Sequence, residues 1–313
     1  MASVAPLIEY RQGAVAAALA SIFPEHIIER VLLVTPPDSE AAHFRNDTAR
    51  RLRYPNYPPY GLAVIAQKLR DIGIEVRILN LNHEVLKSCV DNPEHFNFDV
   101  AWRWKFERAL EEFAPDLIGI TCMFTMTHGS FKKCCEFAAD YGYPVAIGGV
   151  HVTNDVERVL DDIPCADLAF LNEAEIAMVR LVQVVNGKRP VGDLGQVIVV
   201  DGKERHRIRK DVKPQADDID VIPAYDLLPM EEMSNYGTVG AFYAFKPRGT
   251  RFGTVLSNRG CRAQCTFCSV RTFNGVGVRS RSIESVVSEL EQLRDFGVGH
   301  IMWLDDDLLK DHR

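Results

Sequence analysis

Three cysteines within eight residues are the part of this chain best suited to metal chemistry. Cys261, Cys265 and Cys268 are spaced C-x3-C-x2-C and directly follow a short apolar run, residues 252–256, that predicts a strand. Thiolates this close together in a loop can converge on one face of a metal cluster. Because there are three thiolates rather than four, one iron is left without a protein ligand and is open to a substrate.

Two simpler interpretations of these cysteines stay open. A structural zinc site could combine them with a histidine, for which His300 and His312 are the candidates, or the thiols could have no ligand. Zinc sites usually pair cysteines as C-x2-C with a second pair further on, and no second pair follows here.

The cysteine spacing and its flanks resemble the signature of the radical S-adenosylmethionine (radical SAM) superfamily. Phe267 precedes the last cysteine, and residues 257–261 (Ser-Asn-Arg-Gly-Cys) resemble the family's passage from strand to loop. The resemblance implies that Cys261, Cys265 and Cys268 hold a 4Fe-4S cluster whose fourth iron is chelated by SAM.

A second strand-like run, residues 300–304, ends in Asp305, Asp306 and Asp307. Members of the superfamily carry an acidic or glycine-rich turn there that contacts SAM. The resemblance therefore implies SAM contacts from Phe267, Asp305 and Asp306.

Composition limits the classes of protein to which the chain can belong. A length of 313 residues predicts more than one domain, and the net charge of -7 argues against a nucleic-acid surface. No apolar run reaches the roughly twenty residues of a membrane span. We therefore expect a cytoplasmic protein, whose remaining cysteines are buried thiols of a reducing compartment: Cys89, Cys122, Cys134, Cys135 and Cys165.

Strand-like and helix-like segments alternate through the first two thirds of the chain. The predicted strands are 30–35, 75–79, 117–121, 144–147 and 168–171, and the predicted helices are 60–71, 102–113, 130–141, 156–161 and 175–185. Since each crossover passes over the sheet with the same hand, this order predicts a doubly wound, Rossmann-like (flavodoxin-like) α/β fold with a parallel sheet covered on both faces.

Four parts of the chain are predicted. They are an N-terminal helical extension (1–27), a Rossmann-like domain (28–190), a hairpin around Asp201-Gly202 with a linker (191–247), and a C-terminal part (248–313). The superfamily resemblance implies that the last part begins a partial β/α (TIM-like) barrel of six units. Only its first strand, one helix (283–294) and its second strand are present, so we expect the chain to be a fragment of a longer protein.

Ligands of a doubly wound sheet bind outside the carboxyl ends of its strands, in the loops expected here at residues 36–38, 80–83, 121–125, 148–151 and 172–175. Residues 118–125 and 146–153 follow that rule, since they offer hydroxyls after one strand and a glycine pair after the next. These segments resemble those of cobalamin-binding domains, which enclose the dimethylbenzimidazole tail. The resemblance implies cobalamin contacts from six residues: Thr121, Met123, Thr125, Gly148, Gly149 and Val150. A tight turn explains the glycine pair equally well.

One departure from the cobalamin pattern concerns the loop after the first strand. Proteins that ligate cobalt through histidine carry D-x-H-x-x-G there, whereas this chain has Pro-Pro-Asp-Ser-Glu at residues 36–40. Many cobalamin-dependent radical SAM proteins share this departure. The histidines elsewhere are candidates for contact with cobalt or substrate, or are ordinary hydrogen-bonded surface residues: His43, His83, His128 and His151.

The two resemblances together imply a cobalamin-dependent radical SAM enzyme. Such an enzyme cleaves SAM to a 5'-deoxyadenosyl radical, with methyl transfer to an unactivated carbon as one outcome. The alternatives are a cyclase or oxidase without methyl transfer, and a non-catalytic cobalamin-binding or zinc-binding module. The expected partners are a small-molecule substrate and an electron donor such as flavodoxin or ferredoxin, and no catalytic side chain is predicted.

Overall fold

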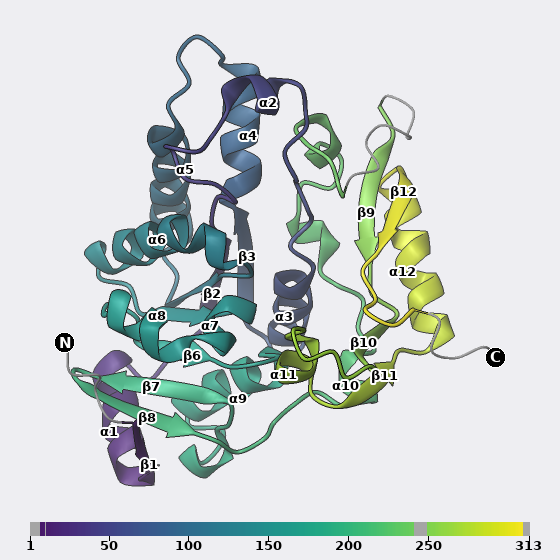
Figure 1. Ribbon diagram of the computed structural model, residues 1–313. Helices are drawn as coiled ribbons and strands as arrows, with labels where there is room; N and C mark the ends of the chain where they lie inside the picture. The colour runs from purple at the N-terminus through teal and green to yellow at the C-terminus, as the bar shows by residue number, and fades with distance from the viewer. Residues whose placement is uncertain (1–6, 10, 241–248, 309–313) are drawn as a thin grey trace.

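The computed structural model describes residues 7–9, 11–240 and 249–308, and His312 lies outside these ranges. Within them the protein has an eight-stranded sheet covered by helices on both faces, and a smaller unit built on two parallel strands (Figure 1). None of the helices described there has the length and apolarity to cross a lipid bilayer.

Five parallel strands form the centre of the main sheet, in the order β3-β2-β4-β5-β6. Numbered along the chain, this is the flavodoxin-like order 2-1-3-4-5, with a topological switch point between β2 and β4. The predicted doubly wound fold is therefore confirmed. The strands are β2 (Arg30–Thr35), β3 (Glu75–Asn80), β4 (Leu117–Thr121), β5 (Val145–Gly148) and β6 (Leu168–Phe170).

Alternating side chains of these strands pack into two separate cores. On β2, Val31 and Leu33 face one core and Leu32 and Val34 face the other, and all four are buried. A strand buried on both faces reads as a continuous apolar run. The first core is covered by α1 (Gln12–Ile22), α3 (Tyr60–Arg70) and α9 (Glu175–Val185); the second by α4 (Leu81–Asp91), α5 (Phe98–Phe113), α6 (His128–Asp140) and α8 (Val156–Asp162).

The predicted hairpin exists as β7 (Val197–Asp201) and β8 (Glu204–Ile208), but it belongs to the main sheet. β7 pairs antiparallel with β6, and β1 (Leu7–Glu9) pairs parallel with β8. The sheet thus extends beyond residues 28–190, because the hairpin hydrogen-bonds to the edge that β6 would otherwise expose. The other boundaries between the predicted parts stay predictions.

Two segments expected as loops begin helices instead. Residues 80–83 enter α4 directly, with the side chain of Asn80 accepting a hydrogen bond from the N–H of His83 at 3.1 Å. Residues 150–151 begin α7 (Val150–Asn154) after the glycine pair. Both helices start at the carboxyl end of a strand. Their first turns therefore face the edge of the sheet at which ligands of this fold bind.

The C-terminal part forms one strand–helix–strand unit, as predicted. β9 (Arg251–Val255) pairs parallel with β12 (Val298–Trp303), and α12 (Ile283–Asp295) connects into β12. Phe252 and Val255 of β9 and Val286 of α12 share a third core with residues of α3. The remaining short elements are α2 (Asn46–Arg50), α10 (Ala216–Ile219), η1 (Thr125–Thr127), η2 (Val191–Asp193), η3 (Tyr225–Leu227) and η4 (Met233–Asn235).

Candidate functional site

The cysteine segment is a loop closed at its base by a small antiparallel ladder. β10 (Asn258–Cys261) pairs with β11 (Gly277–Ser280), so that Cys261 lies opposite Gly277. Gly260 has a φ of 90°, and a Cβ there would collide with the carbonyl oxygen of Gly277. Residues 258–261, expected as the start of an open loop, thus form a strand because β11 returns to pair with them.

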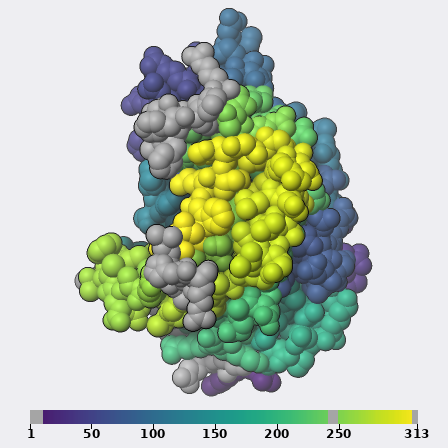
Figure 2. Space-filling model, turned by 90° about the vertical axis from the view of Figure 1, so that its right-hand side faces the viewer, coloured from purple at the N-terminus to yellow at the C-terminus, as the bar shows by residue number. Residues whose placement is uncertain are grey.

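The three cysteines lie at the surface of this segment. Cys265 and Cys268 are exposed, Cys261 is partly buried, and Phe267 is 91% exposed. Figure 2 shows the segment as a yellow-green projection from the molecule. The N–H of Ala263 donates to Sγ of Cys261 at 3.4 Å.

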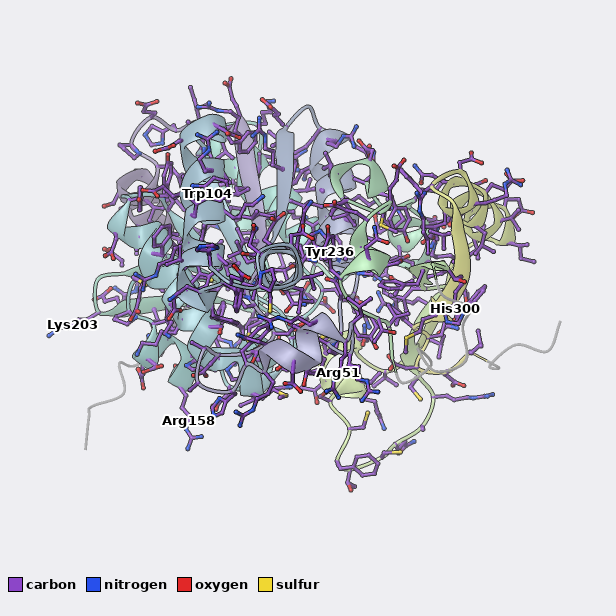
Figure 3. All side chains as sticks on the ribbon, turned by 90° about the horizontal axis from the view of Figure 1, so that it is seen from above. Arg51, Trp104, Arg158, Lys203, Tyr236 and His300 are labelled. Carbon is purple, nitrogen blue, oxygen red and sulfur yellow. The ribbon has the colours of Figure 1, made fainter. Side chains whose placement is uncertain are left out.

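No three His, Cys, Asp or Glu side chains within residues 7–9, 11–240 and 249–308 are close enough to hold a metal ion. The thiols are therefore near one another in sequence without converging on a point. His300, the described candidate for a fourth zinc ligand, lies on β12 (Figure 3).

The two acidic residues predicted to contact SAM differ in their surroundings. The Asp305 carboxylate accepts from the N–H of Ser257 and the side-chain amide of Asn258, both at 2.7 Å, and so joins the carboxyl ends of β9 and β12. Asp306 is exposed at the same turn, and desolvation together with the charge of Asp305 raises its pKa. Asp306 is thus better placed than Asp305 to meet a ligand.

At the carboxyl edge of the main sheet, β4 and β5 end side by side with Thr121 opposite Gly148. Gly149 has a φ of 104°, and a Cβ there would collide with the main-chain carbonyl of Cys122. A Cβ on Gly148 would meet only Phe170, at 3.6 Å. The turn itself therefore requires glycine at position 149, whereas nothing in the turn requires it at position 148.

The loop after β4 presents apolar side chains to solvent at this edge. Met123, Phe124 and Met126 are 60%, 54% and 80% exposed. Val150, the sixth predicted cobalamin contact, is half-buried at the start of α7. An apolar surface at the ligand edge of such a sheet is a place for a largely apolar ligand to bind.

A chain of hydrogen bonds runs from this loop to the surface. Oγ1 of Thr125 lies 3.1 Å from Nδ1 of His151, Nε2 of His151 lies 2.9 Å from Nδ1 of His128, and Nε2 of His128 lies 2.8 Å from Asp162. An arrangement in which the Thr125 hydroxyl and one N–H of each ring donate toward Asp162 satisfies every group in this chain. Desolvation, followed by the charge of His128, lowers the pKa of His151.

The other two candidate histidines lie elsewhere. His83 is buried, and its ring nitrogens contact the amide of Asn56 and the carboxylate of Glu232, both at 3.1 Å. His43 is exposed after the loop that follows β2. Of the four candidates, only His128 and His151 are thus tied to residues predicted to contact cobalamin.

Asp38 lies in the loop after β2, at the switch point. Its N–H donates to Oδ1 of Asn82 at 3.1 Å, and desolvation raises the pKa of its carboxyl group to about 6. A carboxyl group with a pKa near neutrality at the carboxyl edge of a doubly wound sheet is a candidate functional residue.

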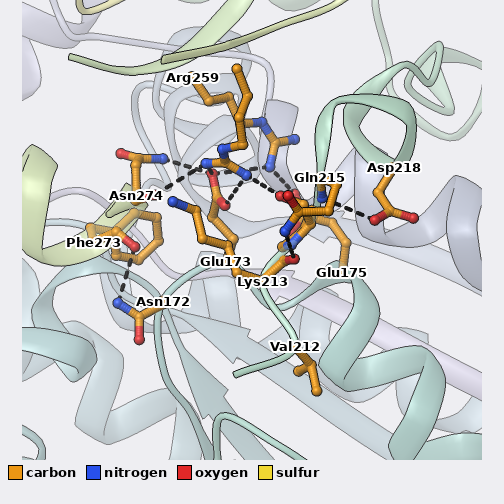
Figure 4. Close-up of polar contacts among 12 residues, drawn as sticks. Asn172, Glu173, Glu175, Val212, Lys213, Gln215, Asp218, Arg259, Phe273 and Asn274 are labelled. Atoms are coloured by element: carbon orange, nitrogen blue, oxygen red, sulfur yellow. Dashed lines mark hydrogen bonds and ion pairs between the residues drawn. The ribbon is translucent and has the colours of Figure 1, made fainter. Parts of the chain in front are cut away.

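The cysteine segment is docked on the same carboxyl edge of the main sheet. Asn172, after β6, donates to main-chain carbonyls of α11 (Val270–Asn274), and Glu173 and Glu175 pair with Arg259 and Arg279 of the ladder (Figure 4). Sequence patterns place residues 172–175 among the strand-end loops but do not reveal this contact. The hydrogen bonds of this contact join residues that are between 84 and 106 positions apart in the sequence.

The side chains fit both implied cofactors. Three thiols on one surface loop are the ligands that a cluster with one open iron requires, and the loop would have to bring them together around it. The carboxyl edge of the sheet at the switch point, where Met123, Phe124 and Met126 are exposed, suits a large, partly apolar macrocycle.

Comparisons with known proteins support this chemistry. A family model described as "B12 binding domain" matches residues 50–182. An uncharacterized methyltransferase of Pyrococcus horikoshii is 30% identical over 285 residues, which cover 89% of this chain and 54% of the relative. Cytidylyl-2-hydroxyethylphosphonate methyltransferase of Streptomyces wedmorensis is 28% identical over 308 residues, covering 90% and 56%. The chain spans about half the length of the curated relatives it matches.

The fold also resembles a solved structure. The radical S-adenosylmethionine methyltransferase TsrM of Kitasatospora setae superposes with a TM-score of 0.63 at 18% identity, over 90% of this chain and 48% of TsrM. The arrangement of a flavodoxin-like sheet followed by a strand–helix–strand unit is thus shared with that enzyme.

Proposed function

We propose that the chain is the cofactor-binding part of a radical SAM methyltransferase, because a B12-binding family model matches residues 50–182 and proteins named as methyltransferases are among its relatives. The proposed cofactors are a 4Fe-4S cluster, SAM and cobalamin. The proposed substrate is a small molecule that receives a methyl group.

One observation carries this proposal. The cysteine segment is docked on the carboxyl edge of the main sheet, through α11 and the β10–β11 ladder. The cysteine segment and the strand-end loops of the main sheet, which we assign to different cofactors, therefore lie on one side of the molecule. A carrier or a zinc module has no need of that placement.

The residues have distinct proposed roles. Cys261, Cys265 and Cys268 hold the cluster, and Phe267 and Asp306 contact SAM. Thr121, Met123, Thr125, Gly148, Gly149 and Val150 line the cobalamin site. The first set would hold a cluster able to supply the electron for SAM cleavage, and the second a cobalamin able to carry the methyl group.

Asp305 and His151 act through other residues. The hydrogen bonds from Ser257 and Asn258 to Asp305 hold the end of β9 against the turn that carries Asp306. His151 holds Thr125 in place within the loop after β4. The protein thereby supplies position and exclusion of water, while the cofactors supply the reactivity.

We further propose that a flavodoxin or ferredoxin supplies the electron and that the protein works in the cytoplasm. All eight cysteines lie in the described ranges and are free thiols, which agrees with a reducing compartment.

Anaerobic reconstitution with iron and sulfide tests the proposal. The protein should gain a broad brown absorption and release 5'-deoxyadenosine from SAM under reducing conditions. Substituting alanine for Cys261, Cys265 or Cys268 should abolish both, whereas Cys165→Ala, at a partly buried free cysteine on another surface, should change neither. Retention of zinc without iron, or of corrinoid without iron, would contradict the proposal.

A further inference from the structure

Asn172 connects the glycine turn of the main sheet, formed by Gly148 and Gly149, to the cysteine segment through hydrogen bonds. Its side-chain amide donates to the carbonyl oxygens of Thr272 at 2.8 Å and Phe273 at 3.0 Å, both in α11. Its main-chain N–H donates to Oγ1 of Thr153 at 2.8 Å, and that hydroxyl donates to the carbonyl of Gly149 at 3.0 Å. One residue thus touches both segments with cofactor chemistry.

The backbone of Asn172 is unusual in a way that suits this role. Its φ is 61°, a left-handed conformation that asparagine tolerates better than most residues. This conformation lets the N–H contact α7 while the side chain reaches α11. A residue in an unfavourable conformation persists only when its contacts hold it there.

Charges next to Asn172 strengthen the same junction. Arg259 and Arg279 are directly opposite each other on the β10–β11 ladder, a position in which like charges repel. Glu173 faces both arginines. Each of its carboxylate oxygens lies 2.8 Å from a guanidinium nitrogen of Arg279, and Oε1 also lies 3.5 Å from Nη1 of Arg259. Glu175, at the start of α9, also accepts a hydrogen bond from Arg259.

This cluster is buried, unlike an ordinary surface ion pair. The side chains of Glu173, Glu175, Arg259 and Arg279 are 2%, 6%, 10% and 14% exposed. Asn274, the last residue of α11, adds an amide donor to Glu173 at 2.7 Å (Figure 4). Docking on residues 173–175 places two carboxylates against the two arginines of the ladder, which favours this place of the cysteine segment on the sheet edge.

We propose that Asn172 and Glu173 are positioning residues that fix the cysteine segment over the glycine turn, and thereby set how strongly the iron–sulfur cluster and the cobalamin interact. This inference rests on the proposed function for the identity of the two cofactors. It concerns neither cluster ligation nor corrinoid affinity, because neither side chain belongs to the residues proposed for those tasks.

The first test uses the protein without cofactors. Asn172→Gly removes both amide donors while accepting the positive φ, so the backbone gains no strain. Tryptic cleavage after Arg271, which lies in α11, should accelerate about tenfold, the factor expected for loss of one or two hydrogen bonds that hold a local segment. Asn186→Ala is the matched control, because Asn186 also makes two side-chain hydrogen bonds, at 2.7 and 2.9 Å to Ile28, but on the opposite edge of the same domain.

The second test uses the reconstituted protein and needs no turnover. In the parent, the reduced cluster should speed the electron-spin relaxation of cob(II)alamin. Asn172→Gly and Glu173→Gln should keep iron and corrinoid contents but weaken this effect severalfold, and Asn186→Ala should match the parent. Glu173→Gln retains the size of the side chain and serves if Asn172→Gly fails to fold.

The outcomes separate this inference from the proposed function. A parent that binds no iron or no corrinoid contradicts the proposed function, and the cleavage test then decides alone whether Asn172 holds the segment. Faster cleavage with unchanged spin relaxation would show a merely structural role and overturn the inference. An unchanged rate of tryptic cleavage in both Asn172→Gly and Glu173→Gln would overturn the inference as well.

Discussion

Asp38 keeps an ionisable carboxyl group where burial penalises its charged form. Desolvation raises its pKa from 3.8 to about 6, so the folded protein binds a proton more readily there than the unfolded chain does. The cost in stability is therefore absent below about pH 4, grows between pH 4 and pH 6, and is complete above about pH 6.

Asp38→Asn should therefore stabilise the protein without cofactors at pH 8, by about 1–3 kcal/mol, because the amide carries no charge to desolvate. The gain should shrink as the pH is lowered from 6 to 4. Urea unfolding monitored by tryptophan fluorescence at several pH values measures it. An equal gain at pH 4 and pH 8 would indicate a steric cause instead of an ionisation effect.

Gly148 and Gly149 should respond differently to alanine. Gly149→Ala forces a Cβ against the carbonyl of Cys122 at a positive φ, and should cost about 1–3 kcal/mol of stability. Gly148→Ala has room for its methyl group and should leave the melting temperature nearly unchanged while lowering corrinoid affinity. Thermal melts without cofactor, followed by corrinoid titration, separate the two glycines; equal melting temperatures would contradict the distinction.

At the scale of elements, the hydrogen-bond chain from Thr125 to Asp162 spans η1, α6, α7 and α8. Because the pKa of His151 is lowered from 6.5, the folded state binds fewer protons than the unfolded state as the pH falls. Its contribution to stability is thus present above about pH 6.5 and is lost below it.

Lowering the pH from 7.5 to 5 should consequently destabilise the parent more than the His151→Gln variant, which cannot be protonated. His83 also has a lowered pKa and Asp38 a raised one, so the informative quantity is the difference between variant and parent at each pH. Parallel curves for the two proteins would show that His151 does not titrate in this range.

Helices and strands with a clear pattern of apolar residues are predictable from this sequence. The continuous apolar runs of β2 and β4 and the helix over residues 175–185 are confirmed, because burial on both faces of a sheet or on one face of a helix fixes the pattern locally. The helix at 81–91 was missed although Asn80 is a capping residue, since its polar first turn resembles a loop. The ladder of β10 and β11 was missed because its partners are short and joined only through tertiary contacts.

The candidate site was predictable to the same extent. The cysteine spacing and the glycine pair are local signals, so the sequence locates the segments. Glu173, Glu175, Arg259 and Arg279 carry no such signal, because each is an ordinary charged residue until the fold brings them together.

At the scale of the whole molecule, a buried polar network joins the C-terminal unit to the main domain. Glu289 of α12 accepts from the hydroxyl of Tyr225 at 2.6 Å and pairs with Arg281, which in turn donates to the hydroxyl of Tyr60 on α3 at 3.0 Å. The side chain of Arg281 is 2% exposed and that of Glu289 is fully buried. Removing Glu289 leaves the buried guanidinium of Arg281 with only the more distant carboxylate of Asp220, at 3.7 Å, as an acidic partner among the described residues.

Glu289→Ala should therefore destabilise the protein by about 3–5 kcal/mol. Glu291→Ala, on the exposed side of the same helix, should change stability by less than about 0.5 kcal/mol. Urea denaturation of both variants gives the comparison. A similar small effect for both would show that the network contributes little to the attachment of the unit.

The ion cluster at the junction also restricts how this architecture can be recombined. Its two carboxylates belong to the sheet domain and its two arginines to the cysteine segment, so a cut anywhere between residues 176 and 258 separates the charges. Consider a chimera that joins the sheet domain of one relative to the cysteine segment of another. Its carboxylates or its arginines are left without partners unless both parents carry the same ion pairs. Domain exchange among such relatives is therefore constrained by four charged side chains that lie outside both of the cofactor sites we propose.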